Sequence, residues 1–127
     1  MFDRDLASRS LGMELLDAGN GRATVRMTVT AEMVNGHDIA HGGYVFLLAD
    51  SAFACACNSH GPVTVAAGAD ISFLQPVRRG EVLVATATER ARTGRSGIYD
   101  VTVARAEGDV VAEFRGRSRT IGPERPA

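Results

Sequence analysis

Residues 35–58, NGHDIAHGGYVFLLADSAFACACN, carry the strongest structural signal in this chain. They open with an Asn-Gly turn signal, continue through the pair Gly42-Gly43, and contain neither Pro nor Gly from residue 44 to residue 58. Apolar residues lie at almost every position of that last segment, which indicates a helix buried on all sides. At about 1.5 Å per residue it spans roughly 22–26 Å and is rich in alanine, so we expect a core helix rather than a membrane span.

Asp50 is the only acidic or basic side chain within residues 44–58. Burial of a carboxylate is costly unless partners or a raised pKa relieve it. One interpretation is structural: Asp50 bonds a neighbouring hydroxyl such as Ser51, or points into water. The other is functional, because Gly42 and Gly43 would leave bare N–H groups and the positive end of the helix dipole facing an approaching ligand. An oxyanion could bind there.

The run N-G-H-x3-H-G-G-x6-D-x7-N resembles the signature of the hotdog-fold acyl-CoA thioesterases, specifically the PaaI-type phenylacetyl-CoA thioesterase family. The resemblance extends from about residue 11 to residue 121. It implies an α+β hotdog fold, in which a curved antiparallel sheet of about six strands wraps around one long central helix. It also implies thioester hydrolysis without metal or cofactor. Carried over by position, Asp50 matches the catalytic carboxylate, Gly42 the N–H that polarises the thioester carbonyl, and Asn35 and His41 the polar residues beside them.

The same resemblance implies an aryl-acyl substrate such as phenylacetyl-CoA or its ring-hydroxylated relatives. A pocket lined by Phe46, Phe53 or Phe73 would stack an aryl ring, although medium-chain acyl groups would also fit an apolar pocket. In relatives the loop that matches residues 95–97 lies near the CoA tail, and the basic pair at 78–79 could contact its phosphates. The candidate substrate-binding residues are Gly43, Phe46, Phe73, Arg78, Arg79, Arg95 and Ser96.

The rest of the chain is rich in β-strand patterns. Asn20-Gly21 is a hairpin signal, residues 23–29 alternate between apolar and polar, and four further runs follow at 63–75, 82–93, 97–106 and 110–121. Short links favour antiparallel neighbours, and with one long helix to cover it the sheet should curl around that helix, which is α+β. We expect one domain over residues 1–127, with 122–127 as a frayed tail.

At the N-terminus, a short helix over residues 3–9 is expected, with Asp3 as its cap and Phe2 and Leu6 directed inward. The same region lacks the basic and apolar parts of a secretory signal, so we expect a cytoplasmic protein. Cys55 and Cys57 are the only cysteines. They point in different directions on a helix and are expected to be small buried residues.

The chain has 14 basic and 15 acidic residues, a net charge of −1, which argues against general binding to nucleic acid or an anionic membrane. All the basic residues are arginines, so lysine Schiff-base chemistry is excluded. His37 and His41 have the spacing of two metal ligands on a helix, but the glycines that follow make that arrangement unfavourable, and no metal site is expected. His60 is expected to be solvated in a loop.

Arginines at 115, 117 and 119 alternate along the last run and so project from one face. They could form a solvated face, a subunit contact or a site for the CoA phosphates.

The separation of Gly42 and Asp50 along the expected helix predicts that the protein is an oligomer. Gly42 and Asp50 are eight residues apart, roughly 12 Å at about 1.5 Å per residue, whereas oxyanion donor and base must each approach the same carbonyl within about 3 Å. We therefore expect a homodimer, or a homotetramer of two dimers, with active sites shared between subunits. Asp50 could act as general base or nucleophile. Rival interpretations are a dehydratase or hydratase on the same fold, and a catalytically silent acyl-CoA-binding module.

Overall fold

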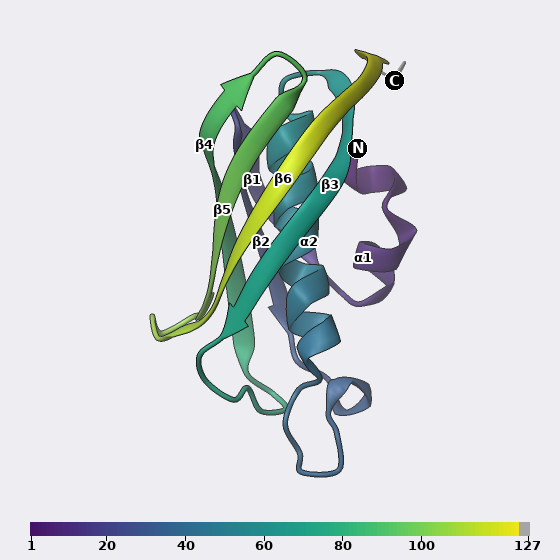
Figure 1. The fold of residues 1–127 in the computed structure, drawn as a ribbon. Helices are drawn as coiled ribbons and strands as arrows, with labels where there is room; N and C mark the ends of the chain where they lie inside the picture. The colour runs from purple at the N-terminus through teal and green to yellow at the C-terminus, as the bar shows by residue number, and fades with distance from the viewer. Residues whose placement is uncertain (125–127) are drawn as a thin grey trace.

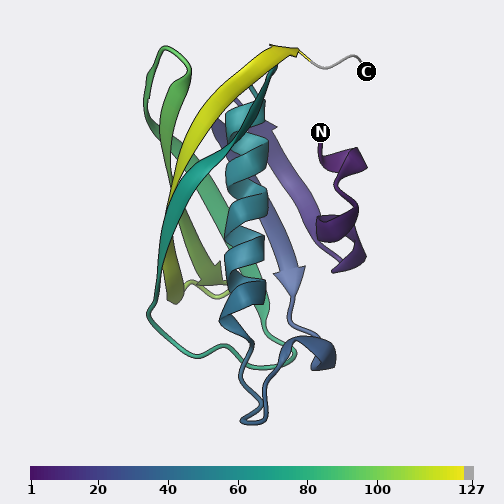
Figure 2. The same cartoon turned by 45° about the vertical axis from the view of Figure 1, so that its right-hand side comes forward.

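One long helix, α2 (Gly42–Asn58), lies along the concave face of a curved sheet of six antiparallel strands (Figures 1 and 2). This computed structural model describes residues 1–124. The strands are β1 (Glu14–Gly19), β2 (Arg22–Thr28), β3 (Pro62–Phe73), β4 (Val82–Thr93), β5 (Ser96–Arg105) and β6 (Val110–Glu124). The predicted α+β arrangement of a central helix and a wrapped sheet is confirmed.

The strands are ordered β1-β2-β4-β5-β6-β3 across the sheet. Consecutive strands pair as expected in β1–β2, β4–β5 and β5–β6, but β3 pairs with β6 rather than with β4, its successor in the chain. The reason is that β2 and β5 already occupy the two edges of β4. The link after β3 therefore crosses one end of the sheet, and β3 becomes an edge strand.

α2 is buried on the sheet side, where residues such as Leu48, Ala52 and Ala56 are inaccessible to solvent. Phe53 shows how closely the helix approaches: its ring centroid is 5.8 Å from that of Phe114 on β6. A Cβ atom on Gly116 would lie 2.8 Å from the Phe53 ring, so this glycine makes room for the aromatic side chain. Burial of a phenylalanine of this kind contributes about 1.5–3 kcal/mol.

The β1–β2 hairpin turns at Asn20 and Gly21, both with positive φ, as the sequence predicts. A turn of 3₁₀ helix, η2 (Ala31–Met33), then leads to the loop before α2. The predicted frayed tail is wrong for residues 122–124, which continue β6 opposite the start of β3; residues 125–127 lie outside the described part. No helix within residues 1–124 combines the length and hydrophobicity that a membrane crossing requires.

The N-terminal segment (residues 1–10) lies beside α2 on the side away from the sheet (Figure 2). It consists of a 3₁₀ turn, η1 (Phe2–Arg4), and a short helix, α1 (Leu6–Ser10). The predicted cap at Asp3 is wrong, because α1 begins later and Asp5 accepts the hydrogen bond from the Ser8 N–H. Leu6, predicted to point inward, is 77% exposed, whereas Phe2 packs against the core.

Candidate active site

The loop before α2 is organised by Asn35. Its Oδ1 atom accepts hydrogen bonds from the N–H of His37 at 2.9 Å and of Ile39 at 3.2 Å. The backbone N–H of Asn35 donates to the Ile39 carbonyl at 2.8 Å. This turn, with Asp38 in the left-handed region at φ 61°, returns the chain to the helix start. The Asn35 side-chain oxygen is therefore engaged in holding the loop that leads to Gly42.

His41 is the N-cap of α2. Its backbone N–H donates to the Met33 carbonyl at 2.8 Å, but its exposed side chain makes no capping hydrogen bond. Among the hydrogen bonds of residues 1–124, none uses the N–H of Gly42 or Gly43. The first turn of α2 therefore presents two donors and the positive end of its dipole to an approaching anion or carbonyl oxygen.

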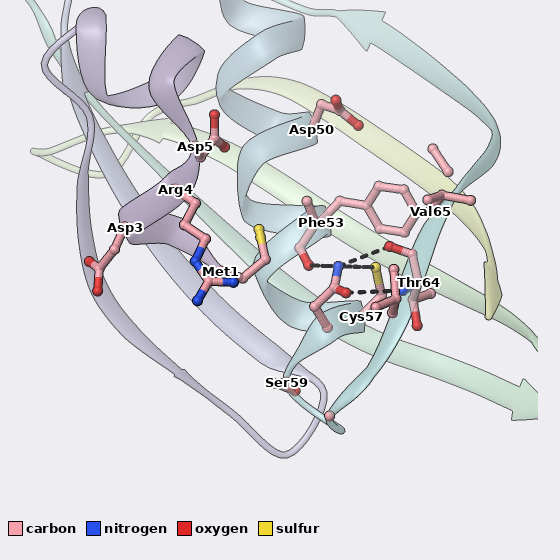
Figure 3. Close-up of a pocket in the computed structure, with 15 residues that line it drawn as sticks. Met1, Asp3, Arg4, Asp5, Asp50, Phe53, Cys57, Ser59, Thr64 and Val65 are labelled. Carbon is pink, nitrogen blue, oxygen red and sulfur yellow. Dashed lines mark hydrogen bonds between the residues drawn. The ribbon is translucent and has the colours of Figure 1, made fainter. Parts of the chain in front are cut away.

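Asp50 lies halfway along α2 and lines an open groove of about 830 Å³ between the N-terminal segment, α2 and the start of β3 (Figure 3). This Asp50 groove has a largely apolar floor that includes Phe53, Ala54, Val63 and Val65. No hydrogen bond from another side chain or backbone group of the described chain reaches the Asp50 carboxylate. The expected structural partner, Ser51, instead bonds the Ser8 hydroxyl at 2.6 Å, so that branch of the structural interpretation is wrong.

The surroundings of Asp50 raise the pKa of its carboxyl above the ordinary 3.8, chiefly through burial and next through the negative charge of Asp5. A carboxylate with a raised pKa is a stronger base when it is ionised. Burial also raises the pKa of Cys55 to about 11 and that of Cys57 to about 12. Both thiols are free and protonated at neutral pH, which suits the predicted role of small buried residues rather than nucleophiles.

The candidate aromatic residues occupy different environments. Phe73 ends β3 next to the helix start: a Cβ atom on Gly42 would lie 2.9 Å from the Phe73 Cζ atom, and Phe73 is 54% exposed. It lines a second hollow of about 260 Å³ with Ile39, Val45 and Val77. Phe46 packs edge-on against Phe114 at a centroid distance of 5.3 Å. Phe53 is fully buried, so of the three rings Phe73 is the most accessible to a ligand.

The candidate arginines lie at opposite ends of the molecule. Arg78 and Arg79 are exposed in the loop after β3, where Arg78 forms a β-bridge with Ile39 and Arg79 lies 3.8 Å from Asp38. This places the pair close to the helix start. Arg95 and Ser96 instead lie at the β4–β5 turn, at the end of the sheet where α2 finishes (Figure 1). One chain therefore brings Asn35, His41, Gly42, Gly43, Phe73, Arg78 and Arg79 to one end, with Asp50 about halfway along.

Two of the three arginines that alternate along β6 form ion pairs. Arg115 pairs with Asp100 and Arg117 with Asp70, both across neighbouring strands. His37 lies in the loop and His41 at the cap, and no group of three or more potential metal-ligating side chains occurs within the part of the chain that the structure describes.

Two hydrogen-bond networks were not predicted from the sequence. The prediction that His60 is solvated is wrong: its Nε2 atom lies 2.7 Å from Glu89 Oε1, which also accepts the Tyr99 hydroxyl at 2.9 Å. The other joins Asp5, Ser8 and Ser51 beside Asp50. The contacts His60–Glu89 and Ser8–Ser51 join residues distant in sequence, so local patterns carry no signal for them.

Comparison with known proteins matches this geometry to one family. Residues 37–112 match the model of the thioesterase superfamily. The acyl-coenzyme A thioesterase PaaI of Escherichia coli is 44% identical over 96% of this chain and 87% of its own length, and its structure superimposes with a TM-score of 0.95. A mutant structure of the phenylacetic acid degradation protein PaaI of Thermus thermophilus is 36% identical over 91% of this chain and 98% of its own, with a TM-score of 0.87. The described architecture is thus the hotdog fold of these proteins, and the chain belongs to the thioesterase superfamily.

Proposed function

We propose that this protein hydrolyses acyl-CoA thioesters to a free acid and CoA. The observation that carries the proposal is that one helix bears both a start with unused N–H donors at Gly42 and Gly43 and a single carboxylate, Asp50, on an open groove. Oxyanion stabilisation and a base are the two functions that thioester hydrolysis requires. The 44% identity to an acyl-coenzyme A thioesterase supports the same reaction.

In the general-base route, Asp50 takes a proton from water as the water oxygen bonds to the thioester carbon. The carbonyl oxygen then carries negative charge, which the Gly42 N–H and the helix dipole stabilise. The carbon–sulfur bond breaks, and the leaving thiolate takes the proton from Asp50. In the nucleophilic route, Asp50 bonds the carbonyl carbon directly, CoA leaves as thiol after taking up a proton, and water hydrolyses the resulting anhydride. Both routes use the same two groups.

The active site is proposed to be shared between two copies of this chain. Gly42 and Asp50 lie roughly 12 Å apart along α2 at about 1.5 Å per residue, which is too far for both to reach one carbonyl. Two α2 helices packed antiparallel across a two-fold axis would bring Gly42 of each copy to Asp50 of the other. β3 supports this dimer because one of its edges has no strand partner within residues 1–124, and Val65 and Phe73 on it are exposed.

The proposed acyl group is aromatic, as in phenylacetyl-CoA or its ring-hydroxylated derivatives. Phe73 is accessible, apolar and adjacent to Gly42, so it could stack on an aryl ring whose carbonyl oxygen is held at the helix start. The exposed pair Arg78 and Arg79 lies beside the same loop and could bind CoA phosphates. A medium-chain acyl group is the second candidate, because the apolar floor of the Asp50 groove could also pack against an aliphatic chain.

Release of free thiol from a panel of CoA thioesters tests the reaction and the substrate together. The panel contains phenylacetyl-CoA, a ring-hydroxylated derivative, octanoyl-CoA and an enoyl-CoA, whose hydration is followed separately. We expect thiol release with the highest kcat/KM for the aryl thioesters. Hydration without thiol release would favour a hydratase, and binding of the thioesters without turnover would favour a silent binding module; either result would contradict the proposal.

A further inference from the structure

We propose that Asp5, on the N-terminal segment that lines the Asp50 groove, controls the acid–base behaviour of Asp50 and so acts as a positioning residue for thioester hydrolysis. This inference rests on the proposed role of Asp50 as base or nucleophile. It assigns a part in the reaction to the N-terminal segment, which the sequence patterns treat only as a short flanking helix.

The position of Asp5 is fixed by its role as the cap of α1. Its Oδ1 atom accepts a hydrogen bond from the Ser8 N–H at 3.0 Å, and its Oδ2 atom accepts one from the Ser8 hydroxyl at 2.6 Å. The same hydroxyl lies 2.6 Å from that of Ser51, the residue after Asp50. Ser8 and Ser51 are both buried. A continuous chain of short hydrogen bonds therefore ties Asp5 to the part of α2 that carries Asp50.

The two carboxylates share the groove without an intervening cation on α2 or β3. Figure 3 shows Asp5 on the N-terminal segment and Asp50 on α2, both among the side chains that line it. The other charged groups on its walls come from the N-terminal segment, and the part of β3 that lines it is uncharged. These groups are the amino group of Met1, Asp3 and Arg4.

Asp5 differs from the rest of this set in its effect on Asp50. After burial, its negative charge is the next cause that raises the pKa of the Asp50 carboxyl, and it also raises that of Cys55. Two carboxylates that line one partly desolvated groove disfavour joint ionisation. Asp5 therefore favours protonated Asp50 at low pH and makes the ionised form a stronger base at higher pH.

Asp5→Asn separates charge from structure. Asparagine caps helices about as well as aspartate, and its side-chain oxygen can still accept from the Ser8 N–H. The Ser8 and Ser51 hydroxyls can reverse their donor and acceptor roles to accommodate the new amide. Asp3→Asn is the matched control, because it removes the same charge from the same segment and the same groove.

The experiment measures kcat/KM for one CoA thioester as a function of pH in the wild-type protein, Asp5→Asn, Asp3→Asn and Asp50→Asn. Ionisation of the substrate is common to all four proteins, so it cancels when kcat/KM of each variant is divided by the wild-type value at the same pH. In the wild type, kcat/KM should rise with pH as Asp50 ionises and then reach a plateau. For Asp5→Asn we expect this rise, the acid limb, to occur at lower pH. At acidic pH kcat/KM should then exceed the wild-type value, whereas on the plateau it should not. Asp3→Asn should leave the limb in place. Carbon-13 NMR titration of the Asp50 carboxyl, identified by its loss in Asp50→Asn, should give the same shift without turnover.

A purely structural role for Asp5 would lower the rate by the same factor at every pH and would overturn the inference. An equal shift in Asp3→Asn would also overturn it, since the effect would then belong to the groove as a whole. If Asp50→Asn is inactive while Asp5→Asn leaves the limb unchanged, the inference fails and the proposed function stands. If Asp50→Asn keeps wild-type activity, it is the proposed role of Asp50 that fails.

Discussion

The hydroxyl of Ser8 lies 2.6 Å from the hydroxyl of Ser51, although 43 positions separate the two residues in the chain. Both are buried, and the contact joins α1 to α2 next to Asp50. A buried hydroxyl needs a hydrogen-bond partner, so this pair fixes where the N-terminal segment docks. The same contact holds Asp5 on the wall of the Asp50 groove.

Removal of either hydroxyl should destabilise the protein by different amounts. Ser51→Ala should lower the free energy of unfolding by about 1 kcal/mol, the usual net value of one hydrogen bond. Ser8→Ala should cost more, about 1–3 kcal/mol, because it leaves the Ser51 hydroxyl buried without this partner and also removes a bond to Asp5. Since both changes break the same bond, the double variant should cost less than the sum.

Denaturant unfolding of the single and double variants measures these differences. Ser10→Ala is the control: Ser10 is exposed on the same helix, where its hydroxyl donates to the Ala7 carbonyl, and its change should stay within about 0.5 kcal/mol. Strict additivity of Ser8→Ala and Ser51→Ala would show that the two hydroxyls do not interact in solution.

Asp50→Asn should abolish most turnover while the protein stays folded. The substitution is nearly isosteric, but it removes both the basicity and the nucleophilicity of the side chain. Because the pKa of Asp50 is raised, its contribution to stability is present below the ordinary value and is lost as pH rises through the raised one. At neutral pH the neutral amide should therefore unfold at the same or a higher temperature.

Thiol release and thermal unfolding, measured on the same preparation, check both parts of this prediction. Asp17→Asn, an exposed position on β1, is the matched control and should change neither. An Asp50→Asn protein that hydrolyses its best thioester within about threefold of the wild-type rate would remove Asp50 from the chemistry, since that factor is under about 1 kcal/mol of barrier.

Glu89 should make stability fall at acidic pH. Hydrogen bonds from His60 and then Tyr99 hold the pKa of its carboxyl below the ordinary 4.5. A lowered pKa contributes stability above the ordinary value, and that contribution is lost as pH falls through the lowered one. Glu89→Gln should therefore be less stable than the wild type at pH 7, with the difference shrinking as pH falls below the ordinary 4.5 and through the lowered pKa.

Urea unfolding at a series of pH values gives this comparison. Glu107→Gln, in the exposed β5–β6 turn, controls for loss of one negative charge and should run parallel to the wild type. Equal pH profiles for the two glutamine variants would mean that the His60–Glu89–Tyr99 contacts add nothing to stability.

The sequence predicts α2 and the wrapped sheet well because those features are encoded locally. A long apolar run without Pro or Gly specifies a core helix, and alternation along 23–29 specifies a strand with one buried face. The expected burial of the helix on all sides is wrong for one chain alone, because the face with Leu47, Asp50 and Ala54 is only half-buried. The neighbours of β3 are not encoded in this way, since they depend on which strand edges β2 and β5 leave free. The cap of α1 was misplaced for a similar reason: Asp3 and Asp5 are both suitable caps, and docking of Ser8 on Ser51 favours the second.

The candidate site also contains some features that local sequence encodes and others that depend on tertiary structure. The position of Asn35, His41 and Gly42 around the start of α2 could be predicted because they are neighbours in the chain and their turn chemistry is local, whereas their proposed roles come from the family resemblance. The separation of Arg78 and Arg79 from Arg95 and Ser96 depends on the path of the chain over the sheet, which a residue pattern does not record. The position of the Asp5 carboxylate in the groove depends in turn on how α1 packs against α2.

Chelators should leave hydrolysis unchanged. No cluster of three or more His, Cys, Asp or Glu side chains within residues 1–124 could hold a metal ion. Extended treatment with EDTA and 1,10-phenanthroline, followed by assay of thiol release, checks this expectation. Loss of the rate that a single divalent ion restores would contradict it.

Complementation between two inactive variants tests the shared site. Gly42 is the first residue of α2, a position where proline is sterically accepted but has no N–H to donate. His41 before it has φ −58° and ψ 136°, a conformation compatible with a following proline. Gly42→Pro should therefore remove the oxyanion donor while the helix remains, although the exposed Phe73 ring must move aside.

Mixing Gly42→Pro with Asp50→Asn after dissociation and reassembly should restore activity. Each mixed dimer then has one site with both substitutions and one site with neither, so random pairing returns about a quarter of the wild-type sites. Mass spectrometry of differently tagged subunits verifies that exchange has occurred, and each variant reassembled alone is the control. Proven exchange without recovered activity, or full activity in a wild-type monomer, would place Gly42 and Asp50 of the same chain in one site and contradict the antiparallel arrangement of the two α2 helices.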